Sequence, residues 1–244
     1  MEQDHQQKLH RHNLIQRQYY EHSEKPHMVP RETRYLRRHV DELLRFAGIL
    51  PGERVLEVGC GMGRYTLLLA QKGVLVEGLD LSPVLLEQLR LFDGGRYNIP
   101  LHCADIADHP PELDGLFDAV AGFFVLHHLH NLPLCFKALT RLLKPGGRVV
   151  FLEPNPYNLL YYAQILVTPG MTWQGDRGIT RMRPATVFRA MQNAGIGRLE
   201  MTRFGFFPPF LVNRSWGARL ESLLERVAVW HAFLPFQLFR GELV

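Results

Sequence analysis

Cysteines and long apolar runs are scarce in this chain. Its 244 residues include only three cysteines, Cys60, Cys103 and Cys135. They are far apart and odd in number, which fits neither a disulfide framework nor a metal-binding motif, so we predict three reduced thiols buried as small apolar side chains. No apolar run is as long as a membrane span, and the polar first residues do not resemble a secretion signal. These absences favour a cytoplasmic globular protein without a metal site.

The charge balance is mildly basic, with 28 Lys and Arg against 24 Asp and Glu and a formal net charge of +4. Part of the excess falls in residues 31–45, where Leu36, Val40 and Leu43 share one face of a predicted helix and the arginines lie on its solvated side. A nucleic-acid binder would instead interleave basic and aromatic residues on one surface. The pattern therefore argues against DNA as a partner and does not favour RNA, which stays open as an alternative.

The most informative segment is residues 55–66, which read VLEVGCGMGRYT. A short apolar strand runs into Glu57, glycines follow at alternate positions, and a helix is predicted over residues 66–72. Glycines at this spacing let the backbone turn sharply and approach a ligand closely. The free N–H groups at the start of the helix point into the same space. We therefore predict a nucleotide-sized site at the carboxyl end of this strand.

Two cofactors compete for this site. The dinucleotide fingerprint G-x-G-x-x-G would place the bulky Arg64 where its third small residue belongs. The pattern acid-x-G-x-G-x-G is met at every position, and it resembles the signature loop of the class I S-adenosylmethionine-dependent methyltransferases. The resemblance implies that this loop holds S-adenosyl-L-methionine through the following residues: Glu57, Gly59, Cys60, Gly61, Gly63 and Tyr65.

Further elements follow in the order that the family shows. Asp80 and Leu81 directly follow a predicted strand over residues 74–79. An acid at this place can accept both ribose hydroxyls. Asp105 and Ile106 follow a strand predicted at residues 99–101. The resemblance implies that Asp105 accepts the adenine amino group and that Ile106 packs on the ring.

The fourth and fifth strands of the family are matched by residues 117–129 and 143–154. The resemblance implies that the first of these two segments carries Phe123 at the cofactor and a loop over the reactive methyl group. Five elements in the right order make the likeness specific.

Strands and helices alternate between residues 54 and 153, which predicts an α/β fold. We expect a doubly wound, mostly parallel seven-stranded sheet of the Rossmann-like type. Residues 1–50 are predicted to be an N-terminal helical extension, in which Tyr19 or Tyr20 either covers the cofactor or packs against the core. Residues 51–154 are predicted to be the cofactor-binding core. Residues 155–244 would hold helical lid insertions with the last helix and strands of the core.

Elements predicted in this last part are a helix over residues 184–194, a strand over 198–204, a helix over 215–230 and an antiparallel strand over 236–240. The two insertions, about 155–182 and 206–235, are rich in aromatic residues. We hypothesise that they form an apolar lid over a small hydrophobic or aromatic acceptor. Two alternatives remain: the aromatic residues only bury the extra helices, or the face with residues 206–210 touches a membrane that carries a lipid substrate.

The resemblance implies methyl transfer by in-line displacement, but leaves oxygen, nitrogen and carbon acceptors open. An alcohol or carbon acid would need a general base, for which His127, His128, His130 and Glu153 are candidates. His-His-Leu is widespread in the family across different substrates, which argues for a structural role of at least one histidine.

Other classes of function remain as alternatives. A binding scaffold could retain the fold without catalysis, but every residue of the signature is present. A short-chain dehydrogenase would need a Tyr-x-x-x-Lys pair, and no lysine lies four residues after a tyrosine. The sequence is compatible with a monomer or a homodimer.

Overall fold

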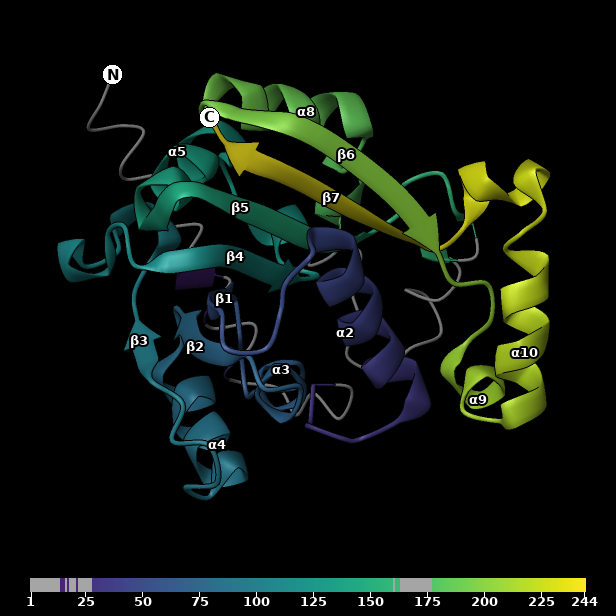
Figure 1. The fold of residues 1–244 in the computed structure, drawn as a ribbon, viewed down its shortest axis with the longest axis horizontal. Helices are drawn as coiled ribbons and strands as arrows, with labels where there is room; N and C mark the ends of the chain where they lie inside the picture. The colour runs from purple at the N-terminus through teal and green to yellow at the C-terminus, as the bar shows by residue number, and fades with distance from the viewer. Residues whose placement is uncertain (1–13, 16, 18–20, 22–27, 160, 163–176) are drawn as a thin grey trace.

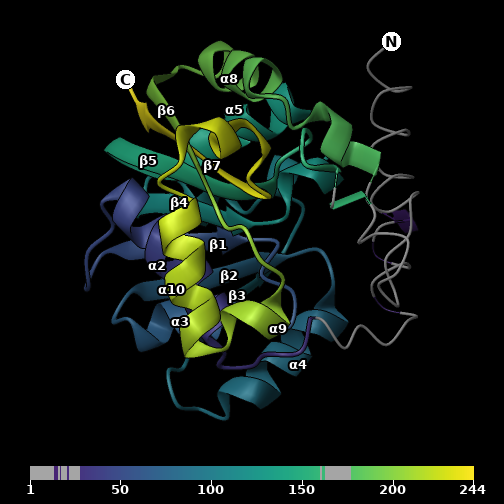
Figure 2. The same cartoon turned by 90° about the vertical axis from the view of Figure 1, so that its right-hand side faces the viewer.

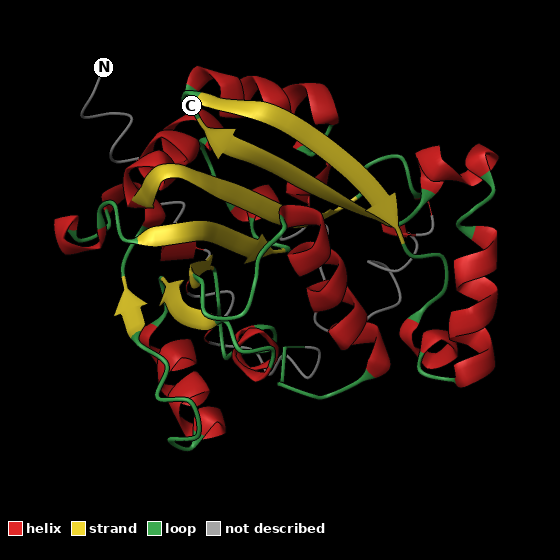
Figure 3. Ribbon diagram, viewed as in Figure 1, coloured by secondary structure: helices red, strands yellow, loops and turns green. Residues whose placement is uncertain are grey.

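A single seven-stranded sheet organises the computed structural model, which describes residues 14–15, 17, 21, 28–159, 161–162 and 177–244. The strand order is β3-β2-β1-β4-β5-β7-β6, and β7 alone runs antiparallel to its neighbours (Figures 1 and 3). The predicted doubly wound, mostly parallel sheet is confirmed. The strands are β1 (Arg54–Val58), β2 (Leu75–Asp80), β3 (Leu101–Cys103), β4 (Phe117–Phe123), β5 (Leu143–Pro154), β6 (Ile196–Phe204) and β7 (Phe236–Leu243).

Three of the helices, α2, α4 and α5, begin at side-chain caps that the sequence provides. Thr33, Ser82 and Asn131 each accept a hydrogen bond from a backbone N–H of the first turn. The helices are α2 (Arg34–Ala47), α3 (Thr66–Gln71), α4 (Pro83–Asp93), α5 (Leu132–Leu142), α8 (Pro184–Asn193), α9 (Pro209–Val212) and α10 (Ser215–Leu224). The 3₁₀ turns include η1 (Ile106–Asp108), η3 (Leu126–His128), η4 (Arg177–Arg181) and η5 (Ala228–Phe233).

Helices cover both faces of the sheet. Successive residues of a strand point to opposite sides, so one strand contributes to the core on both faces. Val120 packs in the cluster that contains α5 and α8, whereas its neighbours Ala119 and Ala121 pack in the cluster that contains α2 and α3. Apolar residues on both faces of a strand are expected in a parallel sheet with helices on both sides. The carboxyl ends of the parallel strands therefore remain as the open edge for a site, and α9 and α10 lie beyond that edge (Figure 1).

Several predictions about local structure need correction. The predicted helix over residues 215–230 ends at Leu224 and resumes as η5, since Nε2 of His231 lies 2.6 Å from the carbonyl oxygen of Glu225 and replaces the next helical N–H there. Cys103 is exposed, unlike Cys60 and Cys135, because it ends the edge strand β3.

Some predictions fall outside the described residues. These are Tyr20 as a cofactor contact, most of residues 1–27 of the N-terminal extension, and residues 160 and 163–176 of the first insertion.

Arg38 fastens the segment between β6 and β7 to α2. Its guanidinium donates to Glu221 and, through Nη2, to both carboxylate oxygens of Glu225 at 2.5 and 2.7 Å. Oε1 of the buried Glu221 also accepts the N–H groups of Phe206 and Phe207, at 2.6 and 2.8 Å. Figure 2 views the molecule from the side where α10 lies. A buried acid on α10 thus organises the chain that leaves β6, and one cation on α2 balances it.

Replacing Arg38 with Met should destabilise the protein by about 3 kcal/mol at pH 8, because two carboxylates lose their cation. Burial already raises the pKa of Glu225, and Arg38 opposes this rise. Without Arg38 the folded state favours the protonated carboxyl, so the deficit should shrink at pH 5. Urea unfolding at both pH values measures it. Arg37→Met, which removes an exposed pair with Glu32, is the control; an equal loss in that variant would contradict the prediction.

Candidate active site

The carboxyl ends of the strands bring the predicted site residues together. Glu57 lies near the end of β1, Asp80 ends β2, and Phe123 ends β4. Asp105 follows β3, and Glu153 lies near the end of β5. Ligands in open α/β sheets bind at this edge. The topology therefore places these residues around one region, as the sequence predicted.

The glycine turn after β1 packs tightly against two neighbouring elements. Gly59 has φ +68°, and a Cβ there would lie 2.5 Å from Cγ2 of Val125 in the loop after β4. Gly63 has φ +91°, and a Cβ there would lie 2.7 Å from Cγ of Leu89 on α4. Both positions combine a left-handed backbone with a close approach, so a side chain would distort the turn.

Asp80 ties the glycine turn to the start of α4. Its Oδ2 accepts the N–H of Gly61 and its Oδ1 accepts the N–H of Ser82, each at 2.9 Å. Burial raises the pKa of Asp80, while these hydrogen bonds oppose the rise. The hydroxyl of Ser82 donates to Oε1 of Glu21 at 2.7 Å. Since a carboxylate has about four acceptor positions, Asp80 retains capacity for ligand hydroxyls.

Glu57 is a buried acid beside the same turn. Burial raises its pKa to about 8, the Thr66 hydroxyl lowers it, and the charge of Asp80 raises it. Its Oε2 atom is buried and accepts no hydrogen bond from the described residues. A buried carboxyl of this kind favours a cationic ligand. Together with Asp80 and Glu21 nearby, Glu57 forms a group of acids. Such a group fits S-adenosylmethionine, which carries a sulfonium and an ammonium group.

Several predicted cofactor contacts lie behind the turn. Tyr65 and Phe123 are buried and stack at a centroid distance of 4.2 Å with an interplanar angle of 10°. The Tyr65 hydroxyl lies 3.0 Å from Nδ1 of His39 on α2. Cys60 packs among α4 residues. In this structure these side chains support the shape of the site from its core side.

The residues after β2 and β3 differ in exposure. Leu81 is partly exposed, whereas Ile106 is buried in the core cluster next to α5. Oδ1 of Asp105 accepts the N–H of Ala107 at 2.9 Å and so caps η1. Asp105 therefore has a structural role in addition to the adenine contact that the resemblance implies.

Glu153 fixes the loop after β4. Its Oε1 accepts the N–H groups of Val125 and Leu126 at 2.8 and 2.7 Å, and Oε2 lies 2.6 Å from Nδ1 of His127. Because the carboxylate only accepts, Nδ1 of His127 carries the proton that faces it. The rings of His127 and His128 lie 3.9 Å apart. The structure thus brings all three predicted catalytic residues together.

Sequence reasoning missed a residue that holds this loop from the other side. Arg181 in η4 donates to the carbonyl oxygens of His127, Leu129 and His130, at 3.3, 3.0 and 3.2 Å. Gly178 lies so close that a Cβ there would be 1.7 Å from the His127 carbonyl oxygen. No local pattern in the sequence signals this contact, because it joins segments about 50 residues apart.

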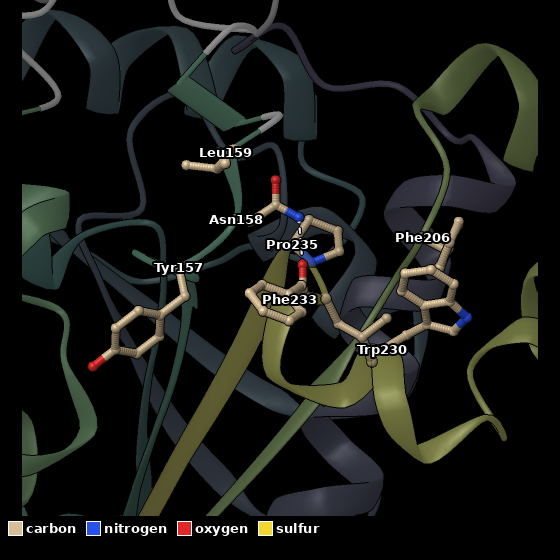
Figure 4. Close-up of a pocket in the computed structure, with 8 residues that line it drawn as sticks. Tyr157, Asn158, Leu159, Phe206, Trp230, Phe233 and Pro235 are labelled. Atoms are coloured by element: carbon tan, nitrogen blue, oxygen red, sulfur yellow. Dashed lines mark hydrogen bonds between the residues drawn. The ribbon is translucent and has the colours of Figure 1, made fainter.

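An apolar pocket lies beyond β5, with a volume of about 250 Å³. Asn158 donates from Nδ2 to the carbonyl oxygen of Phe233 at 2.5 Å and joins its two walls (Figure 4). Tyr157 lies on one side of Phe233, and the Phe206–Trp230 pair on the other (Figure 4). The lining residues are Tyr157, Asn158, Leu159, Phe206, Trp230, Phe233, Leu234 and Pro235.

The described ranges lack two other kinds of feature. They contain no cluster of three or more His, Cys, Asp or Glu side chains able to hold a metal ion. No helix in them has both the length and the apolar character needed to span a membrane.

The buried Glu57 should make stability depend on pH. Its carboxyl has a reference pKa of 4.5 and a folded-state pKa of about 8, so the folded state binds the proton more tightly and loses this stability as pH rises. Relative to Glu57→Gln, the wild type should lose about 4 kcal/mol of unfolding free energy between pH 5 and pH 8. Urea unfolding without cofactor measures the difference, with the exposed Glu200→Gln as control. Parallel curves for wild type and Glu57→Gln would refute it.

Comparison with known proteins gives the family directly. A family model described as a methyltransferase domain matches residues 30–196. A ubiquinone biosynthesis O-methyltransferase of Chromobacterium violaceum is 30% identical over 175 residues, which cover 69% of this chain and 75% of that protein.

Solved structures share the fold. Phosphoethanolamine N-methyltransferase 2 of Haemonchus contortus, in complex with S-adenosyl-L-methionine, has a TM-score of 0.61 at 17% identity; the match covers 84% of this chain and 52%, about half, of that one. Geranyl diphosphate C-methyltransferase of Streptomyces coelicolor A3(2) has a TM-score of 0.57 at 18% identity, with 85% and 80% covered. With the family model, the relative at 30% identity and the acid-flanked glycine turn, the chain belongs to the class I S-adenosylmethionine-dependent methyltransferases.

Proposed function

We propose that this methyltransferase methylates a hydroxyl group of a small hydrophobic molecule. The observation that carries the proposal is the apolar, aromatic pocket, which is built from the residues just beyond Glu153 and from the segment that precedes β7. Pockets for small molecules are mostly apolar and have few polar groups. The name of the Chromobacterium violaceum relative, a ubiquinone biosynthesis O-methyltransferase, supports a hydroxyl acceptor.

Three parts of the chain bind the cofactor, bind the acceptor and cover the cofactor, respectively. Residues 51–154 hold the cofactor, with Glu57 on its cationic amino-acid end, Asp80 on the ribose and Asp105 on the adenine. Residues 155–244 supply the acceptor pocket together with the last strands, and residues 1–50 cover the cofactor. The hydrogen bond between Glu21 and Ser82 supports this cover, because it joins the N-terminal part to the ribose side of the site.

Bound S-adenosylmethionine supplies an electrophilic methyl group on a positively charged sulfur. The residues of the chain hold the two reactants in line and exclude water, which contributes up to about 7–11 kcal/mol in favourable cases. A hydroxyl acceptor also has to lose its proton, and this step needs a general base.

We assign the base to His128 and a positioning role to the pair of His127 and Glu153. His127 is buried and held by Glu153 at 2.6 Å, whereas His128 is partly exposed and its ring lies against that of His127 at a tilt of 43°. A partly exposed imidazole can contact an acceptor and pass its proton to solvent. The buried pair beneath it fixes the ring orientation.

A panel of acceptors tests the chemistry. Methyl transfer to a long-chain alkylphenol should exceed transfer to the matched alkylaniline and to unsubstituted phenol, because both the hydroxyl and the apolar tail are recognised. Mass spectrometry of the products identifies the methylated atom. Calorimetric titration of S-adenosylhomocysteine shows whether the protein binds cofactor; binding with preferential methylation of the amine would refute the hydroxyl assignment, and binding without any turnover would favour a scaffold.

The two histidines should respond differently to substitution. His128→Gln should lower kcat by about 10²–10⁴-fold and remove the rise of kcat with pH near the histidine pKa. His127→Gln should lower kcat less and keep that rise, since it alters only the position of the base. Pre-steady-state methylation from pH 5 to pH 9 separates the two, and circular dichroism checks folding. An unchanged pH profile in His128→Gln would exclude it as the base.

A further inference from the structure

Helix α10 has its polar and apolar sides reversed. A helix on the surface of a water-soluble domain normally buries its apolar side. Here the buried side carries Glu221, which binds Arg38 together with Glu225, the residue that follows the helix. The outward side carries Trp216, Leu220 and Leu223, which are 54, 41 and 58% exposed. Their spacing of four and three residues puts them in one stripe along the helix.

The stripe belongs to a segment, residues 210–233, that is rich in exposed apolar side chains, and we call these side chains the α10 face. Of the eighteen large apolar side chains that are exposed in the described part of the chain, eight lie between residues 210 and 233. Such a concentration marks an interaction site, whereas single exposed apolar residues are ordinary. Its members are Phe210, Trp216, Leu220, Leu223, Val227, Val229, Trp230 and Phe233.

The exposed charge on this segment has one sign. Arg214, Arg219 and Arg226 are exposed, whereas the two acids of the segment point inward to Arg38. Arg219 lies on α10, three residues after Trp216 and four before Leu223, so it neighbours the stripe, and Arg226 follows the end of the helix. Apolar and aromatic side chains with arginines beside them are typical of segments that lie in a membrane interface with anionic lipids.

A second copy of this chain fits the α10 face poorly. A symmetric dimer would bring the same three arginines of both copies together, and the segment has no outward acid to pair with them. A bilayer offers both phosphate groups for the arginines and an apolar layer for the stripe. Tryptophan, present twice on this face, favours the same boundary.

The pocket borders the α10 face. Trp230 and Phe233 line the pocket and are also 44 and 57% exposed, and Leu159 on the opposite wall is 79% exposed. A lipophilic molecule dissolved in a bilayer would therefore meet the pocket without crossing water. We propose that the α10 face docks this protein on anionic membranes. The docking assignment rests on the surface and not on the identity of the acceptor.

Co-sedimentation with vesicles tests the docking. The whole chain should bind vesicles of phosphatidylcholine mixed with phosphatidylglycerol, and it should bind pure phosphatidylcholine less. A combined variant with Trp216→Ser, Leu220→Ser and Leu223→Ser should lower the bound fraction by about tenfold or more. Arg219→Gln with Arg226→Gln should weaken binding to the mixed vesicles and reduce its dependence on salt.

A matched control replaces exposed leucines elsewhere. Leu75→Ser with Leu91→Ser, on β2 and α4, removes similar apolar area and should leave vesicle binding unchanged. Thermal unfolding verifies that each variant folds, and cofactor titration verifies the site independently. Absence of wild-type binding, or equal losses in both sets, would overturn the proposal. Sedimentation of a wild-type dimer that the α10 variant dissociates, without vesicle binding, would identify a self-interface instead.

Discussion

A carboxylate removed from water is tolerated only when its oxygens are well hydrogen-bonded, and Glu153 meets this requirement through one short loop. Two backbone N–H groups and the imidazole of His127 surround it at 2.6–2.8 Å. The requirement fixes the loop after β4, since any other path would leave the acid unpaired. The position of His128, the close approach of Val125 to the glycine turn and the entry into α5 all depend on this one group.

The same loop is also held from the segment beyond β5. Arg181 binds three of its carbonyl oxygens, and the lack of a side chain at Gly178 allows the backbones to meet. The site is therefore fixed by charges of opposite sign on its two sides, an acid under the N–H groups and a cation over the carbonyl groups. The segment between β5 and β6, which lines part of the proposed acceptor pocket, is thus hydrogen-bonded to the loop that carries the proposed base.

Local patterns in the sequence predicted the features that depend on neighbouring residues. The glycine turn, Asp80 at the strand end and the Ser82 cap need only a few residues in register. The roles of Arg38 and Arg181 could not be predicted, because their partners lie about 50 to 190 residues away. The same limit explains Tyr65, whose hydroxyl turns to His39 on a helix that precedes the turn. The break between α10 and η5 likewise depends on a histidine side chain that replaces a backbone donor.

The position of β7 has a consequence for the order of assembly. β7 lies between β5 and β6 in the sheet, yet it follows β6 in the chain. Within the described residues strand β6 pairs with β7 alone, so among them it has no hydrogen-bonded neighbour strand until residues 236–243 are available. During synthesis the five strands from β3 to β5 can pair first. Until β7 is synthesised, the edge strand β6 remains an unpaired segment. Unpaired strands of this kind are prone to incorrect pairing.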